Sequence, residues 1–427
     1  MHLILSLTGG LLSAGRNYDL LIVGGGIAGA SLGRSMARAG SRVLIVEKSL
    51  EFRDRIRGEV LLPWGGVEAM ELGIHELLLK ACGQELPREY FIRDGVARPP
   101  REFQTTAPRG NGIVSFFHPE MQEVLLAEAE RCGCDVWRGA NISAINLDNR
   151  PVAMIETASG QREVEGRLIV GADGRDSYVA TLLGFRRDRD PPQLFSGGLQ
   201  LKGDIPTDRA LYFYQNGTTG RGAILVTNKP GNYRAYVFHH VSSLTRRWSG
   251  ERDYPAAKAH FIDVGAPRDW IEALTPHGVH ATFDGAHQWI SHPARQGCAL
   301  IGDAAGSSDP VWGCGLSRTL RDVRLLRDRL LSDNDWLRAS NAYAVDHDDF
   351  FHRLRRAEHV NATLFFTPGE KGDALRQVAF DLLQKYPELA PDTAGLGPES
   401  NCTDDSEKAL LGFVQWKGAA ANPVSIT

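Results

Sequence analysis

The sequence predicts an α/β fold in which a Rossmann-like dinucleotide-binding domain carries an inserted antiparallel-sheet domain and a helical C-terminal region. Residues 18–47 show the pattern strand, glycine turn, helix and strand, which is typical of a βαβ unit. Residues 186–290 instead hold short strand candidates separated by turn signals, which predicts an antiparallel sheet. Residues 346–384 are charged and helical in pattern. A chain of 427 residues is long enough for roughly two or three compact units.

The composition excludes several classes of function. A net charge of -4 leaves no basic stripe for a nucleic acid. The chain has no run of about 20 apolar residues, and residues 1–15 lack the charged leader of a secretion signal, so we expect a cytoplasmic protein without a membrane segment. The six scattered cysteines indicate reduced structural thiols. His347, His352 and His359 are too widely spaced to ligate one ion, so we expect surface histidines and no metal site.

The first glycine turn has the features of a dinucleotide site. Gly24, Gly26 and Gly29 form G-x-G-x-x-G directly after the apolar strand candidate at residues 18–23 and open a helix. Gly24 permits the tight turn, Gly26 lets the backbone approach a pyrophosphate, and Gly29 lets helix and strand pack closely. The helix N-terminus offers free N–H groups to the phosphates. Glu47, at the end of the second strand, can accept hydrogen bonds from ribose hydroxyls and repels a 2′-phosphate, so we expect FAD or NAD.

A second segment selects FAD. Residues 298–316 are a strand, Gly-Asp-Ala-Ala, a loop with proline, and Gly-x-Gly opening a helix. This pattern resembles the second FAD motif of the p-hydroxybenzoate-hydroxylase-like superfamily, the group A flavoproteins. The resemblance implies a glutathione-reductase-type domain in which Asp303 accepts hydrogen bonds from the ribityl hydroxyls. It also implies that Gly313 and Gly315 let backbone amides approach the flavin pyrimidine edge, where the helix N-terminus stabilises negative charge on reduced flavin.

Further segments extend the resemblance. Residues 168–174 resemble the Asp-Gly motif of the superfamily near the pyrophosphate, and this motif includes Asp173. Arg57 and Glu59 match the segment that follows the second strand in related flavoproteins, and Arg57 is implied to reach the FAD phosphates or the active-site mouth. Gln122 lies on a helix where relatives often contact the FAD ribose. The implied cofactor contacts are Gly24, Gly26, Ala28, Gly29, Glu47, Lys48, Arg57, Gln122, Asp173, Asp303, Gly313, Gly315 and Leu316.

These motifs divide the chain into three parts. We assign residues 18–185 and 291–345 to a discontinuous FAD-binding domain, while residues near 85–115 can contribute strands to the second sheet. Residues 186–290 are assigned to the substrate-binding sheet. Residues 346–427 are assigned to a helical C-terminal region with a loose tail, because the tail holds glycine, proline and acidic residues.

Three groups of enzymes share this scaffold: single-component monooxygenases, flavin-dependent halogenases and geranylgeranyl-reductase-like enzymes. Many monooxygenases carry histidine after Gly-Asp-Ala-Ala, but this chain has Gly306 there, as halogenases and reductases do. After the Asp-Gly motif Ser177 is kept, whereas Ala180 stands where arginine is usual. Residues 58–63 also resemble halogenases. The sequence therefore departs in part from each group.

We favour a monooxygenase over the alternatives. The W-x-W-x-I-P segment of halogenases is missing, and Arg93 and Lys80 are poor candidates for the halogenase lysine. The reductases act on long, membrane-associated isoprenoids. No second G-x-G-x-x-G exists, so NADPH or NADH is expected to dock transiently, although a halogenase fed by a separate reductase would lack that motif too. A non-enzymatic FAD scaffold is the least favoured alternative.

The resemblance implies that NAD(P)H reduces FAD and that O₂ adds at flavin C4a. The resulting hydroperoxide would hydroxylate or epoxidise a small organic substrate, aromatic or natural-product-like. Pocket side chains can be named only as candidates, because alternation along a strand does not say which face is inward without the register. No catalytic acid or base is assigned, and the oligomeric state stays open. The pocket candidates are Pro310, Trp312, Tyr236 and His240, and the other alternating side chains are Tyr212, Tyr214 and His239.

Overall fold

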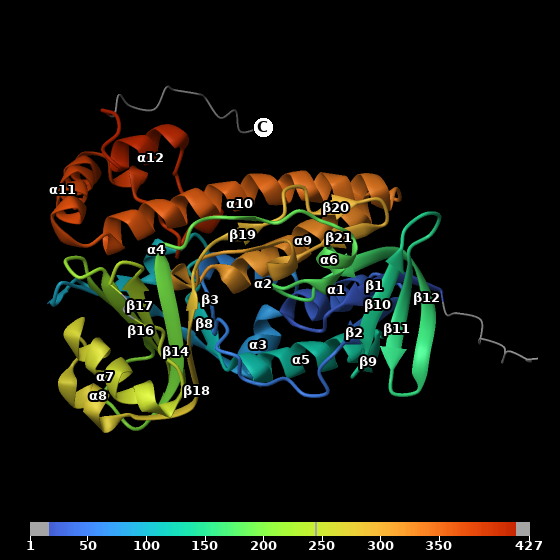
Figure 1. Cartoon of the computed structure of the whole chain (residues 1–427), viewed down its shortest axis with the longest axis horizontal. Helices are drawn as coiled ribbons and strands as arrows, with labels where there is room; N and C mark the ends of the chain where they lie inside the picture. The colour runs from blue at the N-terminus through green and yellow to red at the C-terminus, as the bar shows by residue number, and fades with distance from the viewer. Residues whose placement is uncertain (1–16, 244–245, 416–427) are drawn as a thin grey trace, which may run out of the picture.

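The computed structural model describes residues 17–243 and 246–415, in which two large sheets are joined by long helices (Figure 1). The eight-stranded dinucleotide sheet has the order β10-β11-β12-β1-β2-β9, with β21 paired to β12 and β20 paired to β21. Strands β9, β2, β1, β12 and β21 run parallel, so the predicted α/β arrangement is confirmed. The strands are β1 (Asn17–Val23), β2 (Val43–Glu47), β9 (Asp135–Arg138), β10 (Asn141–Asn146), β11 (Val152–Thr157), β12 (Gly160–Gly171), β20 (Ala294–Arg295) and β21 (Cys298–Leu300).

The first βαβ unit forms because its residues suit their surroundings. Strand β2 is buried along its whole length, as a central strand of a parallel sheet requires. Gly24 follows β1 with a φ of +106°, a conformation that favours glycine. An added Cβ on Gly29 would lie 1.9 Å from the Gly24 carbonyl oxygen, which confirms that glycine is needed for close helix–strand packing. Among the helices that pack in this core are α1 (Ile27–Arg38), α5 (His118–Arg131) and α9 (Gly315–Ser332).

The second large sheet has the order β18-β14-β17-β16-β15-β5-β6, with β7 beside β5. Its pairs are antiparallel except β15 with β5, so the predicted antiparallel sheet is confirmed. Strands β5 to β7 come from the stretch near residues 85–115. The strands are β5 (Arg88–Arg93), β6 (Val96–Ala97), β7 (Arg101–Glu102), β14 (Leu194–Lys202), β15 (Ala210–Asn216), β16 (Arg221–Lys229), β17 (Asn232–His240) and β18 (Thr275–Asp284).

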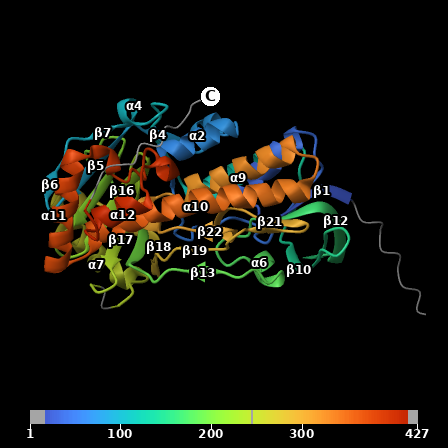
Figure 2. The same cartoon turned by 90° about the horizontal axis from the view of Figure 1, so that it is seen from above.

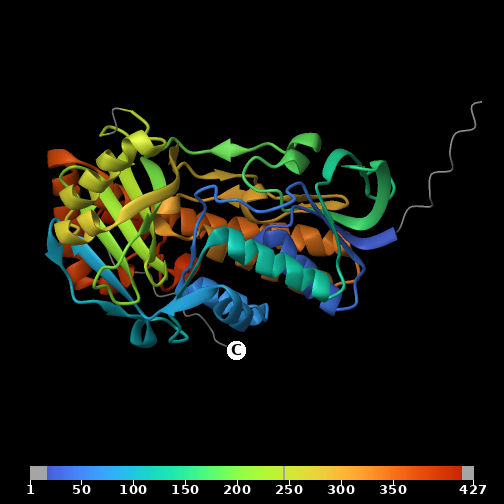
Figure 3. The ribbon, with the colours of Figure 1, turned by 90° about the horizontal axis from the view of Figure 1, so that it is seen from below.

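Shorter elements complete the fold. Strands β3, β4 and β8 form one small sheet, and β13, β19 and β22 form another. Helices α7 and α8 lie over one face of the second large sheet (Figure 3). The bounds are β3 (Val60–Leu61), β4 (Gly83–Leu86), β8 (Ile113–Phe116), β13 (Asp188–Arg189), β19 (Gln288–Trp289), β22 (Gly306–Ser307), α2 (Pro63–Glu71), α3 (His75–Ala81), α4 (Phe103–Thr106), α6 (Tyr178–Leu182), α7 (Tyr254–Asp263) and α8 (Arg268–Ala273).

The register of the second sheet resolves the ambiguity left by its alternating side chains. Tyr212 and Tyr214 belong to the core beneath α7 and α8. Leu211 and Phe213 belong to the opposite core, and Tyr236 packs against it. Tyr236 is therefore the tyrosine on the cavity side of the sheet, and the other two tyrosines are buried on the opposite side, beneath α7 and α8.

Helix α10 (Trp336–Phe366) is continuous over 31 residues and runs along both sheets (Figures 1 and 2). Trp336 and Tyr343 pack in the core of the dinucleotide sheet, whereas Leu354 and Phe366 pack in the core beside the second sheet. The expected domain boundary at residue 345 thus falls inside one helix. The other boundaries stay predictions. Two shorter helices follow, α11 (Gly369–Lys385) and α12 (Asp404–Leu410).

The prediction of a loose tail is wrong for residues 387–411. Leu389 is buried, and Asp392 forms a two-pronged ion pair with Arg101 at 2.7 and 2.8 Å. Trp64 Nε1 donates to the Thr393 carbonyl oxygen at 3.0 Å. These long-range contacts fix the segment, and its glycine and proline content does not reveal them. Residues 416–427, like the lead-in at residues 1–16, lie outside the described residues.

The prediction of surface histidines is wrong for His347. Its side chain is 1% exposed, and its Nδ1 lies 2.7 Å from Asp322 Oδ1. The reason is that α10 packs on α9 along the face that carries His347. His352, in contrast, is exposed as predicted.

Two further findings concern the chain as a whole. All six cysteines are free thiols, as predicted. Across residues 17–243 and 246–415, no helix combines the length and apolar character needed to cross a membrane.

Candidate functional site

The predicted motifs meet in one cavity of about 1120 Å³. That volume exceeds the range of roughly 300–1,000 Å³ usual for a small-molecule site, so the cavity is large. Gly29 packs behind the turn. The prediction of His240 as a pocket residue is wrong, because His240 is the last residue of β17 and packs beside Gly220, where its Nδ1 lies 2.7 Å from Ser242 Oγ. The predicted residues that line it are Gly24, Gly26, Ala28, Glu47, Lys48, Arg57, Gln122, Asp173, Tyr236, Asp303, Pro310, Trp312, Gly313, Gly315 and Leu316.

The dinucleotide end is built around the turn between β1 and α1. A Cβ added to Gly26 would meet only the Gln122 side chain, at 3.4 Å, so the turn leaves open space above the helix N-terminus. The Glu47 carboxylate accepts from the backbone N–H of Gly25 at 2.8 Å and of Ser49 at 2.7 Å. These bonds fix the carboxylate at the end of β2, where it can accept further bonds from ribose hydroxyls.

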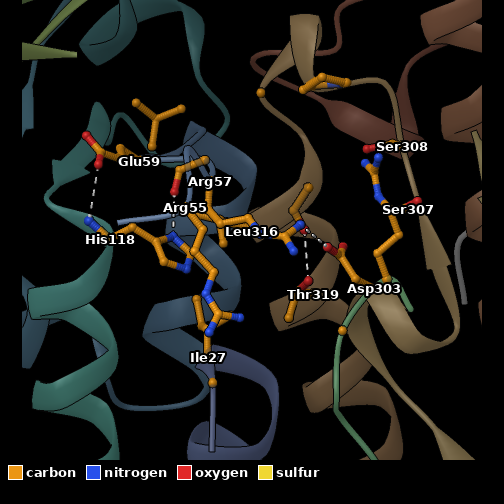
Figure 4. Close-up of a pocket in the computed structure, with 18 of the residues that line it drawn as sticks. Ile27, Arg55, Arg57, Glu59, His118, Asp303, Ser307, Ser308, Leu316 and Thr319 are labelled. Carbon is orange, nitrogen blue, oxygen red and sulfur yellow. Dashed lines mark hydrogen bonds and ion pairs between the residues drawn. The ribbon is translucent and has the colours of Figure 1, made fainter. Parts of the chain in front are cut away.

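Asp303 is held by two arginines. Arg318 Nη2 lies 2.8 Å from Asp303 Oδ1, and Arg57 Nη1 lies 3.7 Å from Asp303 Oδ2. Arg318 is fully buried, whereas the Asp303 side chain is 31% exposed. The two arginines thereby hold the carboxylate in place, and it stays accessible to a ligand. In Figure 4, a dashed line reaches Asp303 from Arg57, and His118 lies on the other side of the cavity from Asp303 and Thr319.

Unpartnered polar atoms on the cavity wall fit a polar cofactor. Asp173 Oδ2 caps α6 by accepting from the Tyr178 and Val179 N–H groups, but its Oδ1 has no partner among the described residues. The buried hydroxyls of Ser307 and Ser308 also lack partners there. Buried polar groups normally have hydrogen-bond partners, so these atoms fit the phosphates and hydroxyls of FAD. The two serines, shown in Figure 4, were missed because their segment has no charge pattern.

The segment before α9 carries the flavin-edge glycines. Gly313 has a φ of +67°, and a Cβ on Gly315 would meet no atom within 4 Å. The backbone at the helix N-terminus is therefore open to a ligand. Trp312 is 9% exposed, and its Nε1 has no partner in the described chain. Pro310 and Trp312 thus form a wall of the same cavity.

His118 is a cavity residue that sequence reasoning missed. Its Nδ1 lies 2.7 Å from the Gly58 carbonyl oxygen. A carbonyl only accepts, so Nδ1 carries the hydrogen and Nε2 is an acceptor. Burial lowers the pKa of His118 to about 4, which keeps the ring neutral at ordinary pH. The available signal was its spacing from Gln122, since residues four apart share one helix face.

Glu59 holds one wall of the site in place. Its carboxylate pairs with the fully buried Arg234, with Nη2 2.5 Å from Oε1, and also accepts from the Asn228 amide. Arg234 reaches Asp54 at 2.9 Å. Residues 54–59, which follow β2, are thus held against β17. Tyr236 on β17 adds to this attachment by donating to the Arg57 carbonyl oxygen at 2.9 Å.

The other end of the cavity is apolar. Side chains from β5, β15, β16 and β17 form its floor, and the segment at residues 391–394 borders the cavity as well. Such a surface binds an organic molecule by burying apolar area. The apolar lining residues are Phe91, Leu211, Phe213, Ile224, Val226, Phe283 and Phe365.

Comparison with known proteins gives the family. The FAD binding domain model matches residues 17–333. The chain is 25% identical over 403 residues to 6-methylpretetramide 4-monooxygenase of Streptomyces rimosus, covering 87% of this chain and 90% of that protein. It is 22% identical over 371 residues to 1H-pyrrole-2-carbonyl-(peptidyl-carrier protein) chlorinase of Pseudomonas fluorescens, covering 76% of this chain and 78% of that protein.

A solved structure agrees with this assignment. The p-nitrophenol 4-monooxygenase PnpA from Pseudomonas putida has a TM-score of 0.75 at 15% identity, covering 91% of this chain and 100% of that chain, and so shares its fold. Because the family model spans most of the chain and its motifs converge on one cavity, the protein belongs to the FAD binding domain family and is an FAD-dependent oxidoreductase of the p-hydroxybenzoate-hydroxylase-like superfamily.

Proposed function

We propose that this enzyme is an FAD-dependent monooxygenase that uses NADPH or NADH and O₂ to hydroxylate or epoxidise a small, largely apolar organic molecule. One observation carries the proposal: a single cavity contains both the FAD motifs and an apolar floor from the second sheet. Bound FAD supplies the electron transfer and oxygen chemistry. The names of the two monooxygenase relatives support this reaction class.

The chain contributes binding, orientation and exclusion of water. Trp312 contacts Phe213 and Phe365, with ring centroids 6.2 and 6.1 Å away. These rings offer water few polar partners, which protects reactive chemistry beside them. We infer that the substrate packs on this aromatic wall and is thereby presented to the flavin.

Basic side chains support transient docking of the nicotinamide nucleotide. Lys48, Arg53, Arg55 and Arg175 line the same cavity as the FAD motifs. Positive charge gathered in a cleft attracts phosphate groups and raises the association rate. Because the chain has no second G-x-G-x-x-G, we infer that NADPH or NADH binds here and leaves after electron transfer.

Halogenation is the second candidate, since one relative is a chlorinase. The positions of the lysines favour oxygenation instead. Among the described residues, Lys48 is the lysine that lines the cavity, and it follows Glu47 at the dinucleotide end. Lys80 is 78% exposed on α3, and Arg93 lies over the Phe380 ring; neither lines the cavity.

Anaerobic stopped-flow reduction tests the proposal. The purified protein should be yellow with one FAD per chain, and NADPH or NADH alone should bleach it, slowly without substrate and faster with it. Oxygen should then return the flavin to the oxidised form, and product should carry label from ¹⁸O₂. A halogenase would need an added flavin reductase and halide. A saturating reductase would turn over without oxygen and add two hydrogens to an alkene.

Some outcomes would contradict the proposal. A protein that binds NAD but not FAD would remove its basis. No reduction by NADPH or NADH, with or without a broad panel of aromatic and polyketide-like compounds, would rule out a self-sufficient monooxygenase.

Asp303→Ala should weaken FAD binding about 10- to 100-fold. A hydrogen bond to a charged group contributes roughly 1.5–3 kcal/mol, and the Asp303 carboxylate is aimed into the cavity by Arg318. Titration of apoprotein with FAD, followed by flavin fluorescence, measures the change. Asp328→Ala on α9, where the side chain is 46% exposed, is the matched control and should bind as the wild type does. Equal affinities would show that the ribityl chain does not contact Asp303.

A further inference from the structure

Glu89 is an acidic side chain on the apolar floor of the cavity. Strand β5 pairs in parallel with β15, so Glu89 lies beside Leu211 and Phe91 beside Phe213. All four side chains line the cavity, because alternate residues of a strand share one face. A carboxyl group is therefore presented among apolar and aromatic side chains at the end of the cavity away from the glycine turn.

The Glu89 carboxyl has no hydrogen bond or ion pair within residues 17–243 and 246–415. Nearby charges are Arg101 and Asp392, which act on it in opposite directions. The guanidinium of Arg101 binds other partners, since it holds Asp392 with both Nη atoms and donates from Nε to Thr106 Oγ1 at 3.1 Å. Arg98 also lines this region, with its guanidinium 5.9 Å from the centre of the Phe91 ring. No cation of the described chain therefore neutralises Glu89 directly.

An unpaired carboxyl group in such surroundings favours particular ligands. Loss of water raises the pKa of Glu89 to about 7. A ligand hydroxyl or ammonium would donate to the carboxyl oxygens and offset the cost of their desolvation. A ligand carboxylate in the same place would be repelled by ionised Glu89.

We propose that Glu89 selects the substrate: the cavity takes an apolar molecule that bears a hydrogen-bond donor, a hydroxyl or an amine, and disfavours carboxylates. This inference rests on the proposed function only in taking the apolar floor as the substrate end. Glu89 acts as a specificity-determining residue that contacts the ligand. Its neighbours do not need it for structure, because Arg101 and Asp392 pair with each other.

Three naphthalene probes with one body and different ends test the inference on the FAD-loaded enzyme. They are 2-naphthalenemethanol, 2-naphthylmethylamine and 2-naphthoate, and changes in the visible spectrum of bound FAD report their dissociation constants. Naphthoate should bind the wild type about tenfold more weakly at pH 8 than at pH 6, since Glu89 ionises between these values. At pH 8 the alcohol and the amine should bind at least tenfold more tightly than naphthoate.

Glu89→Gln keeps the shape of the side chain and removes its charge. In this variant naphthoate affinity should be equal at pH 6 and pH 8, and the amine should bind about tenfold more weakly than it binds the wild type at pH 8. Comparing Glu89→Gln with the wild type distinguishes a pH effect of Glu89 from one of Asp309, a buried carboxyl group whose pKa is also raised by burial, to about 7. Glu102→Gln is the matched control, because Glu102 lies on neighbouring β7 and pairs with Arg88 outside the cavity.

Two results would overturn the inference. One is a Glu89→Gln variant whose probe preferences and pH dependence match those of the wild type. The other is that none of the three probes shows saturable binding. Neither measurement needs turnover, so a failure of NADPH reduction would remove the monooxygenase proposal and leave the outcome for Glu89 intact.

Discussion

Arg318→Met is expected to destabilise the protein by about 3–5 kcal/mol, since it removes one partner of a buried ionic network. Arg318 is fully buried and binds the Gly302 carbonyl oxygen at 3.2 Å and Asp322 at 3.4 Å, in addition to Asp303. Asp322 is fully buried and also contacts His347. Without the guanidinium, the Asp322 carboxylate stays buried with less compensation. Urea unfolding of the apoprotein measures the loss independently of FAD.

Two variants make this test specific. Arg329→Met, on the same helix, removes an arginine that is 45% exposed and pairs with Asp346 at 2.8 Å. A surface pair of that kind contributes about 0–1 kcal/mol, so this control should stay near wild-type stability. Adding Asp322→Asn to Arg318→Met should recover part of the stability, because the uncompensated charge is gone. Equal losses for Arg318→Met and Arg329→Met would show that burial of the network is not what stabilises it.

The parts of the site that the sequence predicts are those with local causes. A glycine turn that requires a positive φ and a carboxylate at a strand end are properties of a few neighbouring residues, and Gly24, Glu47 and Asp303 line the cavity as expected. Trp312 lies in the same short motif as Asp303, at residues 298–316. These positions therefore needed no knowledge of distant contacts.

The remaining parts depend on pairings between distant segments. Tyr236 faces the cavity and Tyr212 faces away because of the register of β15, β16 and β17, which alternation alone does not give. Residues 391–394 reach the cavity through the pair of Asp392 with Arg101, which are 291 positions apart. Glu89 gains its unusual environment only when β5 joins β15. Sequence patterns carry none of this information.

A pair of buried histidines makes the second sheet sensitive to acid. The rings of His239 on β17 and His260 on α7 are 4.4 Å apart, and His239 also contacts Trp248. Neither ring nitrogen of His239 has a partner within the described residues. Burial lowers the pKa of His239 to about 3, with smaller contributions from His260 and Arg221. Burial lowers the pKa of His260 to about 4, although its hydrogen bond to the Gly222 carbonyl oxygen acts in the opposite direction.

The free energy of unfolding should therefore fall as the pH drops below about 6.5, the usual pKa of an unfolded histidine. In that range the unfolded chain binds protons that the folded chain does not, so acid favours unfolding. Between pH 7 and pH 4.5 each of the two histidines should remove about 2 kcal/mol. His239→Phe should reduce this acid loss by about that amount. At pH 7 it should leave stability within about 1 kcal/mol of the wild type or raise it, because two unpartnered buried nitrogens disappear.

Urea unfolding at pH 7 and pH 4.5 provides the comparison. Carboxylates also lose their native partners in acid, so the informative quantity is the difference between the acid losses of wild type and variant. His352→Gln is the control, since His352 is exposed on α10 and should keep the full wild-type acid loss. If His239→Phe loses as much stability on acidification as the wild type, His239 must become protonated in the folded protein at little cost, and α7 must separate from β17 to admit water.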